Sequence, residues 1–252
     1  MSFWEGILLG TLQGLTEFLP VSSSGHLLLA EKLFQIPENL FFHLMLHLGS
    51  LAAVIVLYRK SIWALLRHPF SKKTLYFLLA CVPTFGLAFV FRFYLEDLVN
   101  GALLPVGFLL TAILLVLGET FGKNRQSVEE TQPWVPLLTG FVQGLAVLPG
   151  LSRSGSTISA MCLCGVKRED AGEFSFLLSI PIICGSGLVE GLTMTATEWQ
   201  NVAVLPTVSG VICAAISGAI AIVFVQKLLQ SAKMKYFAVY LAIPFLISLI
   251  LL

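Results

Sequence analysis

Apolar residues dominate this chain in long stretches that are separated by short polar segments. Six of the stretches have the length of about 20 residues that an α-helix needs to cross a hydrocarbon core of about 30 Å. We expect these membrane spans at residues 41–58, 75–95, 103–121, 174–191, 203–226 and 236–252. The pattern therefore predicts an all-α polytopic membrane protein with six transmembrane helices.

Two further regions are apolar but are interrupted by proline, serine and glycine. The first has a helical pattern over about 3–19, a break at 20–25 and a second apolar arm of about nine residues before Glu31. Such an arm reaches about 13 Å, or half of a bilayer. The region 134–166 repeats this plan around a break at 149–155. We predict that both regions are re-entrant helical hairpins, the first of them over about 3–34.

The two interrupted regions are related in sequence at a constant offset of 130 positions. The matches are Gly10/Gly140, Gln13/Gln143, Gly14/Gly144, Leu15/Leu145, Ser22/Ser152, Ser24/Ser154 and Gly25/Gly155. Each copy holds one hairpin and three spans, so the second copy is inverted relative to the first, as in transporters with broken helices. We expect one membrane domain over 1–252, with a first repeat at 1–121 and a second, inverted repeat at 133–252.

Composition supports a lipid environment. Hydrophobic residues make up 57% of the chain, charged residues make up 12%, and the mean hydropathy is +0.90. The net charge is +1, and the chain lacks the concentrated basic face that nucleic-acid binding requires. We therefore expect no nucleic-acid partner. The five cysteines lie among apolar neighbours and are expected to be small buried hydrophobes.

Most of the Lys and Arg residues lie in four connecting segments, which indicates the orientation in the membrane. These segments are 59–73, 123–132, 167–170 and 227–235. Basic loops favour the cytoplasmic side. We therefore expect both termini and the loops near Glu38, Glu96-Asp97 and Glu198 on the outer face. The first hairpin then enters from outside and the second from the cytoplasm.

The break of the second hairpin contains Arg153, whose charge costs about 2.5–3.5 kcal/mol at the centre of a membrane. Irregular backbone at this depth persists where it is buried in protein or lines a wet cavity. Ser152, Ser154, Ser156 and Thr157 surround Arg153, and a helix starting after the break directs free amides to the same place. We expect an anion site that suits phosphate, because helix capping alone explains the serines but not the arginine.

The break of the first hairpin offers three hydroxyls, from Ser22, Ser23 and Ser24. Gly25 permits close backbone approach, and His26 can transfer a proton near neutral pH. We expect His26 to be functional because it adjoins these serines. The activity of the protein should then depend on pH through His26.

Gln13 and Glu17 are four residues apart and share one face of the leading helix. Their oxygens, together with phosphate, suit a divalent cation such as Mg²⁺ or Ca²⁺, which we expect as the cofactor. Glu17 alternatively acts as a general acid or base. His43 and His47 also share a helix face, but we expect two structural histidines there and leave them out of the predicted site.

The motifs resemble the two signature regions of the bacterial undecaprenyl-pyrophosphate phosphatases, the bacitracin-resistance family. The matching stretches are Gln13-Gly-Leu-Thr-Glu17, Pro20-Val-Ser-Ser-Ser-Gly-His26 and Pro149-Gly-Leu-Ser-Arg-Ser-Gly-Ser-Thr157. The resemblance implies an enzyme of the bacterial inner membrane, open to the outer face, that removes the terminal phosphate of undecaprenyl pyrophosphate and recycles this lipid carrier for cell-wall synthesis. It also implies that the catalytic residues are Glu17, Ser23, His26 and Arg153.

We predict that the remaining polar residues of the two breaks bind the substrate. These are Ser22, Ser24, Gly25, Ser152, Ser154 and Thr157. Arg153 and the free amides would hold the phosphoryl oxygens. The attacking group is either the Ser23 hydroxyl or a water molecule directed by Glu17 or His26. The expected partners are the prenyl pyrophosphate and membrane lipids, and a homodimer is left open.

Three other functions compete with this interpretation. An inverted-repeat secondary transporter or lipid flippase shares the fold plan but needs no cluster of Ser, His, Arg and Glu. The type-2 phosphatidic-acid phosphatases also carry Ser-Gly-His and Ser-Arg, found here at 24–26 and 152–153, but they place a second histidine five residues after Ser-Arg, which this chain lacks. A membrane scaffold without activity predicts that Glu17→Gln changes nothing.

Overall fold

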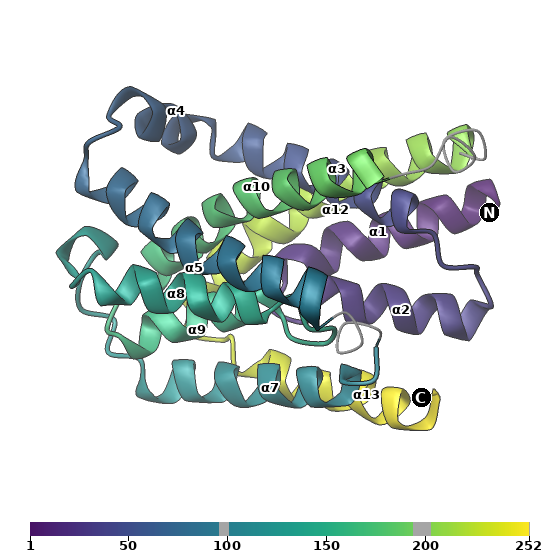
Figure 1. Ribbon diagram of the computed structural model, residues 1–252. Coiled ribbons are helices and arrows are strands. Elements are labelled where there is room, and N and C mark those ends of the chain that lie inside the picture. The colour runs from purple at the N-terminus through teal and green to yellow at the C-terminus, as the bar shows by residue number, and fades with distance from the viewer. Residues whose placement is uncertain (96–100, 194–202, 252) are drawn as a thin grey trace.

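A computed structural model describes residues 1–95, 101–193 and 203–251, and the regular elements of these residues are helices. In chain order they are α1 (Phe3–Phe18), α2 (Ser23–Phe34), α3 (Leu40–Leu57), α4 (Arg59–Arg67), α5 (Lys72–Tyr94), α7 (Leu104–Phe121), η1 (Val128–Glu130), α8 (Trp134–Leu145), α9 (Arg153–Leu163), α10 (Arg168–Thr193), α12 (Val204–Gln230) and α13 (Tyr236–Leu251). The N- and C-termini lie at one end of the bundle and α4 at the other (Figure 1). The predicted outer segments near Glu96-Asp97 and Glu198 lie outside the described residues.

Five of the described helices are long and apolar enough to cross a membrane, namely α3, α5, α7, α10 and α12. They coincide with five of the predicted spans, and the chain is a multi-pass membrane protein. The sixth predicted span, 236–252, corresponds to α13, which has 16 residues. A helix of this length covers about 24 Å, less than a hydrocarbon core of about 30 Å. Six spans therefore remain a prediction.

The segment 59–73 contains a helix where we predict only a connecting loop. Helix α4 places Trp63 and Leu66 among basic residues, and none of its side chains is buried. A short basic helix with an apolar side suits the interface between lipid and water. Its nine residues are too few for a periodic pattern to stand out beside the charge of the segment.

Each of the two predicted hairpins consists of two helices, which are separated where the sequence places the break. Helices α1 and α2 contact each other across the first break, and α8 and α9 do so across the second (Figure 1). Helix α2 continues past the apolar arm and Glu31 to Phe34, the residue at which the hairpin predicted over about 3–34 ends. The glutamate does not end the helix because its side chain is 3% exposed and its carboxylate lies 2.6 Å from the ring of His43.

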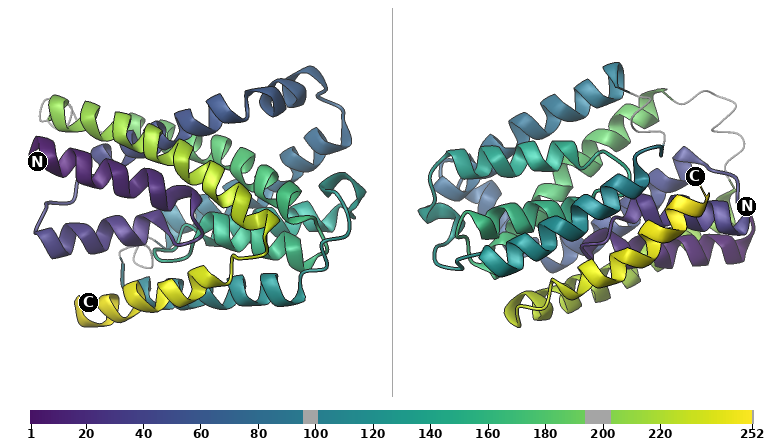
Figure 2. Two further views of the ribbon diagram at one scale, coloured as in Figure 1. Left: turned by 180° about the vertical axis from the view of Figure 1, so that it is seen from behind. Right: turned by 90° about the horizontal axis from the view of Figure 1, so that it is seen from below.

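Helices that lie 130 positions apart make corresponding contacts. Helix α1 packs against α12, and its counterpart α8 packs against α5, the counterpart of α12. Likewise, α2 contacts α13 and α9 contacts α7. Figure 2 shows α1 alongside α12 in the view from behind.

The closest backbone approaches of the two helix pairs also correspond. A Cβ atom on Gly10 would lie 2.2 Å from the carbonyl oxygen of Gly210, and one on Gly140 would lie 1.9 Å from that of Ala80. No side chain fits at either distance, so both contacts require glycine. Small residues at such crossings let helices pack tightly in a membrane.

Large aromatic side chains form the core around the two breaks. Phe18, Phe108, Phe174 and Phe176 are each less than 2% exposed. The rings of Phe18 and Phe176 meet edge to face with their centroids 5.6 Å apart. Such an apolar shell excludes water, and it strengthens the electrostatic interactions of the polar groups that it encloses.

Candidate functional site

Each break ends in a helix N-terminus that is capped by a serine. The Ser22 hydroxyl accepts a hydrogen bond from the amide of Gly25 at 3.4 Å, and the Ser152 hydroxyl accepts one from the amide of Gly155 at 3.1 Å. Each capping hydroxyl also lies 3.3–3.4 Å from the hydroxyl of the serine two residues later. The sequence repeat is thus a repeat of local structure, in which two helix N-termini carry the same cap.

The two breaks contact each other. The Ser154 hydroxyl donates a hydrogen bond to the carbonyl oxygen of Leu19 at 3.3 Å, and Arg153 Nη2 donates one to Glu17 Oε1. A Cβ atom on Gly155 would lie 3.1 Å from Pro20 Cβ. Residues from the two related regions therefore form one site.

Glu17 is the centre of this site. Besides Arg153, its carboxylate accepts hydrogen bonds from the Ser23 hydroxyl at 2.5 Å and from Gln13 Nε2 at 2.9 Å. The residue is 7% exposed, and a carboxylate this deeply buried needs a countercharge and several donors. The structure thus brings together Glu17, Ser23, Arg153 and Gln13, four of the predicted site residues.

His47 is also part of the site, which the sequence did not predict. Its Nε2 atom lies 3.6 Å from Glu17 Oε2, and its Nδ1 lies 2.8 Å from the carbonyl oxygen of His43. One turn earlier on α3, His43 Nε2 lies 2.6 Å from Glu31 Oε1. The spacing of the two histidines was the available signal, but it does not reveal which helices their shared face contacts.

His26 is anchored by groups other than Glu17 and Ser23. Its Nδ1 lies 2.7 Å from the carbonyl oxygen of Ser22, and its Nε2 lies 2.9 Å from the hydroxyl of Tyr240 on α13. The edge of Phe108 packs against the ring with centroids 5.6 Å apart. Both ring nitrogens are therefore engaged within the protein, and a direct role in catalysis stays a prediction.

The predicted hydroxyls of the second break are engaged in the protein's own hydrogen bonds. Ser152, Ser154 and Thr157 are at most 3% exposed. Thr157 donates to the carbonyl oxygen of Arg153 at 2.8 Å and lies 2.6 Å from the Ser175 hydroxyl. In the structure these three residues support the break, and substrate binding by them stays a prediction.

The hydroxyls of the first break differ in how open they are. Ser22 is buried together with Gly25, whereas Ser23 is half-buried and Ser24 is exposed. A ligand that enters the site from outside the protein therefore meets Ser23 and Ser24 first.

Five buried side-chain polar atoms have no hydrogen-bond partner among the described residues. They are Gln13 Oε1, Glu31 Oε2, Gln143 Oε1, Arg153 Nη1 and Ser156 Oγ, of which the last two belong to the helix that follows the second break. Buried polar groups are nearly always paired, so each such atom calls for an explanation. The guanidinium and hydroxyl are donors that suit phosphoryl oxygens, and the other three atoms are acceptors.

The predicted metal ligands Glu17 and Gln13 do not form a metal site of their own. Both oxygens of Glu17 already accept hydrogen bonds, and Gln13 offers one free oxygen. Across residues 1–95, 101–193 and 203–251, no group of three His, Cys, Asp or Glu side chains could hold a metal ion. Mg²⁺ and Ca²⁺ take about six or more oxygen ligands. A divalent ion fits here only where a substrate and water supply most of its ligands.

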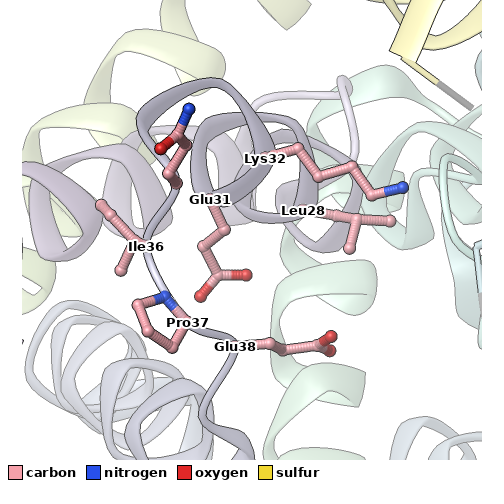
Figure 3. Close-up of a pocket in the computed structure, with 7 residues that line it drawn as sticks. Leu28, Glu31, Lys32, Ile36, Pro37 and Glu38 are labelled. Carbon is pink, nitrogen blue, oxygen red and sulfur yellow. The ribbon is translucent and has the colours of Figure 1, made fainter.

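A cavity of about 380 Å³ lies at the end of α2, away from the breaks (Figure 3). It is lined by Leu28, Glu31, Lys32, Gln35, Ile36, Pro37 and Glu38. Glu31, which lines this cavity, contacts His43, and His43 lies one turn before His47 on α3. The lining contains none of the predicted site residues.

The fold and the site together define a multi-pass membrane protein with a buried polar site, centred on Glu17 and Arg153, between two interrupted helix pairs. Residues 6–246 match the family described as Bacitracin resistance protein BacA. The chain belongs to this family, which confirms the resemblance seen in the motifs.

Relatives of similar length carry one name. The chain is 38% identical over 245 residues to the Undecaprenyl-diphosphatase of Carboxydothermus hydrogenoformans, covering 95% of this chain and 94% of that protein. It is 37% identical over 255 residues to the Undecaprenyl-diphosphatase of Treponema denticola, covering 96% and 94%. Undecaprenyl-diphosphatase 4 of Bacillus cereus is 34% identical over 242 residues, covering 95% and 93%.

Proposed function

We propose that this protein is a membrane phosphatase that hydrolyses undecaprenyl pyrophosphate to undecaprenyl phosphate and inorganic phosphate. This reaction recycles the lipid carrier for cell-wall synthesis and gives resistance to bacitracin. The observation that carries the proposal is the contact of Ser23 and Arg153 with one carboxylate, Glu17, where two helix N-termini meet. The family and the names of the relatives support the same activity.

The site offers phosphate two kinds of stabilisation. Helices α2 and α9 both begin at the breaks, so their free amides and positive dipole ends favour an anion there. Arg153 Nη1 is a buried donor without a partner among the residues that the structure describes, and it would bind a phosphoryl oxygen as charge develops on it. Ser156 adds a second free donor from the same helix.

The geometry favours Ser23 as the attacking group. Its hydroxyl already donates to Glu17 at 2.5 Å, so the carboxylate can take the proton as the oxygen attacks the terminal phosphorus. The anhydride P–O bond breaks, and its electron pair leaves on the bridging oxygen of the prenyl monophosphate. Water then hydrolyses the phosphoserine, which releases inorganic phosphate and restores the serine hydroxyl.

We further propose that the divalent cation enters as a complex with the pyrophosphate. The pyrophosphate and water would supply most of its ligands, since the protein offers few free oxygens beside Glu17. This proposal predicts that the affinity for Mg²⁺ or Ca²⁺ is low without substrate. Calorimetric titration of the cation into the protein, with and without an unreactive pyrophosphate analogue, measures that difference.

For the architecture, we propose six spans and two re-entrant hairpins in two inverted repeats, 1–121 and 133–252. Support comes from the corresponding contacts of α1 with α12 and of α8 with α5. We place the protein in the bacterial plasma membrane with the site open to the outer face, because the basic segments favour the cytoplasm. No observation specifically favours the alternative of a transporter or flippase.

The decisive experiment is phosphate release from undecaprenyl pyrophosphate by the purified protein in detergent, with added Mg²⁺ or Ca²⁺. We expect hydrolysis by the wild type and a loss of about 100-fold or more in Arg153→Ala, since one donor to developing charge is worth about that much. Arg125→Ala, at an exposed arginine in a loop, is the matched control. Equal activity in all three proteins would remove Arg153 from the mechanism, and no hydrolysis by the wild type would overturn the function.

Trapping the intermediate tests the role of Ser23. Acid quenching during turnover of substrate labelled in the terminal phosphate should leave label on the wild type, and mass spectrometry should place it at Ser23. Ser24→Ala should keep the label and Ser23→Ala should lose it. Hydrolysis by the wild type without any labelled protein would indicate direct attack by water.

A further inference from the structure

A hydrogen-bonded chain connects the last helix to the first break. Tyr240 on α13 meets His26 Nε2 at 2.9 Å, and His26 Nδ1 meets the Ser22 carbonyl oxygen at 2.7 Å. The hydroxyl and the ring come from residues 214 positions apart. The chain ends one residue before Ser23, whose hydroxyl contacts Glu17.

The partners of the ring determine the direction of these bonds. A carbonyl oxygen can only accept, so His26 Nδ1 carries a hydrogen and donates it to Ser22. In the neutral ring, Nε2 then has a lone pair and accepts from the Tyr240 hydroxyl. Both neighbours are uncharged, and the arrangement selects one tautomer of the histidine.

The ring is also held in place by packing. The planes of His26 and Tyr240 are 6° from parallel with centroids 5.7 Å apart, and Phe108 meets the histidine ring at 83°. His26 is 7% exposed, so its polar atoms depend on these partners.

The hydrogen-bonded chain ends at Ser22, whose backbone has an unfavourable conformation. Ser22 has φ 71° and ψ 100°, a region that residues other than glycine seldom adopt. Such conformations persist where surrounding contacts enforce them, and they gather at functional sites. The carbonyl of Ser22 is held by the histidine ring and by the amide of His26 at 3.2 Å.

We propose that Tyr240 and His26 are positioning residues that hold the Ser22 backbone and thereby aim Ser23 at Glu17. The tyrosine holds the ring through Nε2, and the Nδ1 hydrogen of the histidine holds the turn. The effect on catalysis rests on the proposed function. The assignment of the tautomer and of the brace does not, because it follows from the hydrogen bonds alone.

This proposal separates His26 from acid–base catalysis. If the histidine braces the turn, an asparagine that donates from nearly the same position as Nδ1 should replace it in part. If instead the ring transfers protons, asparagine and alanine should be equally inactive. His26→Asn and His26→Ala therefore give opposite answers for the two roles.

The tyrosine offers a test that changes one oxygen atom. Tyr240→Phe keeps the ring and removes the donor to His26. Tyr236→Phe is the matched control, because it makes the same change one turn earlier on α13, where the side chain is 62% exposed. The first readout is ¹⁵N NMR of the imidazole rings in the full-length protein in detergent, with the His26 signals assigned by their loss in His26→Asn.

We expect all three proteins to show the tautomer protonated at Nδ1, because the Ser22 carbonyl oxygen can only accept, and we expect the Nε2 signal to shift in Tyr240→Phe alone, where this atom loses its hydrogen bond. In the phosphatase assay, kcat should fall about 5- to 10-fold in Tyr240→Phe with KM nearly unchanged, as for the loss of one hydrogen bond. His26→Asn should retain at least about ten times the activity of His26→Ala, again the scale of one hydrogen bond.

Three outcomes overturn the proposal. The first is an Nε2-protonated ring in the wild type, and the second is equal inactivity of His26→Asn and His26→Ala. The third is Tyr240→Phe with wild-type kcat and a lowered melting temperature, which would make the contact one of helix packing alone. A wild type without phosphatase activity would refute the proposed function, while the NMR result would still decide the tautomer.

Discussion

The two breaks share one scaffold and carry different chemistry. Their serine caps, glycines and leading glutamines occupy equivalent positions, 130 residues apart. At the positions that differ, Ser23 corresponds to Arg153, Glu17 to Val147 and His26 to Ser156. The first break thus supplies the hydroxyl, the carboxylate and the imidazole, and the second supplies the positive charge.

The comparison suggests how a repeated unit becomes a single site. The identical positions build the local fold, because caps and close helix contacts have the same requirements in both copies. The chemistry lies where the copies diverge, because opposite charges have to come from opposite sides of the contact. Gln13 and Gln143 are identical and occupy equivalent positions, but their side chains donate to different groups. Gln13 donates to Glu17 at 2.9 Å, whereas Gln143 donates to the Leu178 carbonyl oxygen at 3.3 Å.

The largest effect should follow from making the first break resemble the second at its central position. Glu17→Val removes the partner of Ser23 and leaves Arg153 buried without its countercharge. We expect activity to fall by at least about 1,000-fold and stability by about 3–5 kcal/mol, the cost of breaking a buried ion pair. Phosphate release and thermal unfolding in detergent measure the two effects.

Glu129→Gln, at an exposed glutamate, is the control for a lost carboxylate. Glu17→Gln separates charge from packing, since it keeps the shape and should lose activity with a smaller loss of stability. Full activity in Glu17→Gln would show that the carboxylate does not take the proton of Ser23, and attack without Glu17 as the general base would then be the better interpretation.

An intermediate effect is expected at His47, which has no equivalent in the second break, because Leu177 occupies that position. Its ring lies 3.6 Å from Glu17 and helps to hold the carboxylate on the side away from Arg153. His47→Leu should lower kcat about 5-fold, the value of a partly exposed ion pair. His47→Gln, which keeps a donor, should lie between His47→Leu and the wild type.

His68→Leu is the matched control, since this histidine is exposed in the loop after α4. If His47→Leu and His68→Leu both retain wild-type kcat, Glu17 is oriented by Ser23, Gln13 and Arg153 alone. The centre of the site would then consist only of residues that the sequence predicts.

The membrane spans, the two breaks and the importance of Arg153 can be predicted from the sequence. The spans follow from the length of apolar stretches, and Arg153 stands out because a charge in lipid requires a reason. The offset of 130 positions identifies the two breaks as related and so indicates that they work together. These signals are local or repeated, and they need no knowledge of which helices pack together.

The remaining features depend on packing between distant segments. Nothing near His47 in the sequence indicates that α3 turns it towards Glu17, 30 positions earlier. Tyr240 lies in an apolar helix whose pattern is uniform, so its contact with His26 has no sequence signal. The burial of Glu31 has the same cause, since its partner is His43 on another helix.

The smallest effect should come from the capping serines, and it tests whether the shared positions serve only the fold. Ser22→Ala and Ser152→Ala each remove one cap, which costs about 1 kcal/mol, or a few degrees of melting temperature for a chain of this size. We expect similar losses of stability in both and at most a few-fold change in KM, since both side chains are at most 4% exposed and bond their own helices. Ser248→Ala, at a buried serine on α13 whose hydroxyl donates to a backbone carbonyl, controls for the loss of an ordinary buried hydroxyl. A rise in KM of about 100-fold in Ser152→Ala alone would make this serine a substrate ligand, and the division between a shared scaffold and divergent chemistry would then fail at the position where the two breaks are most alike.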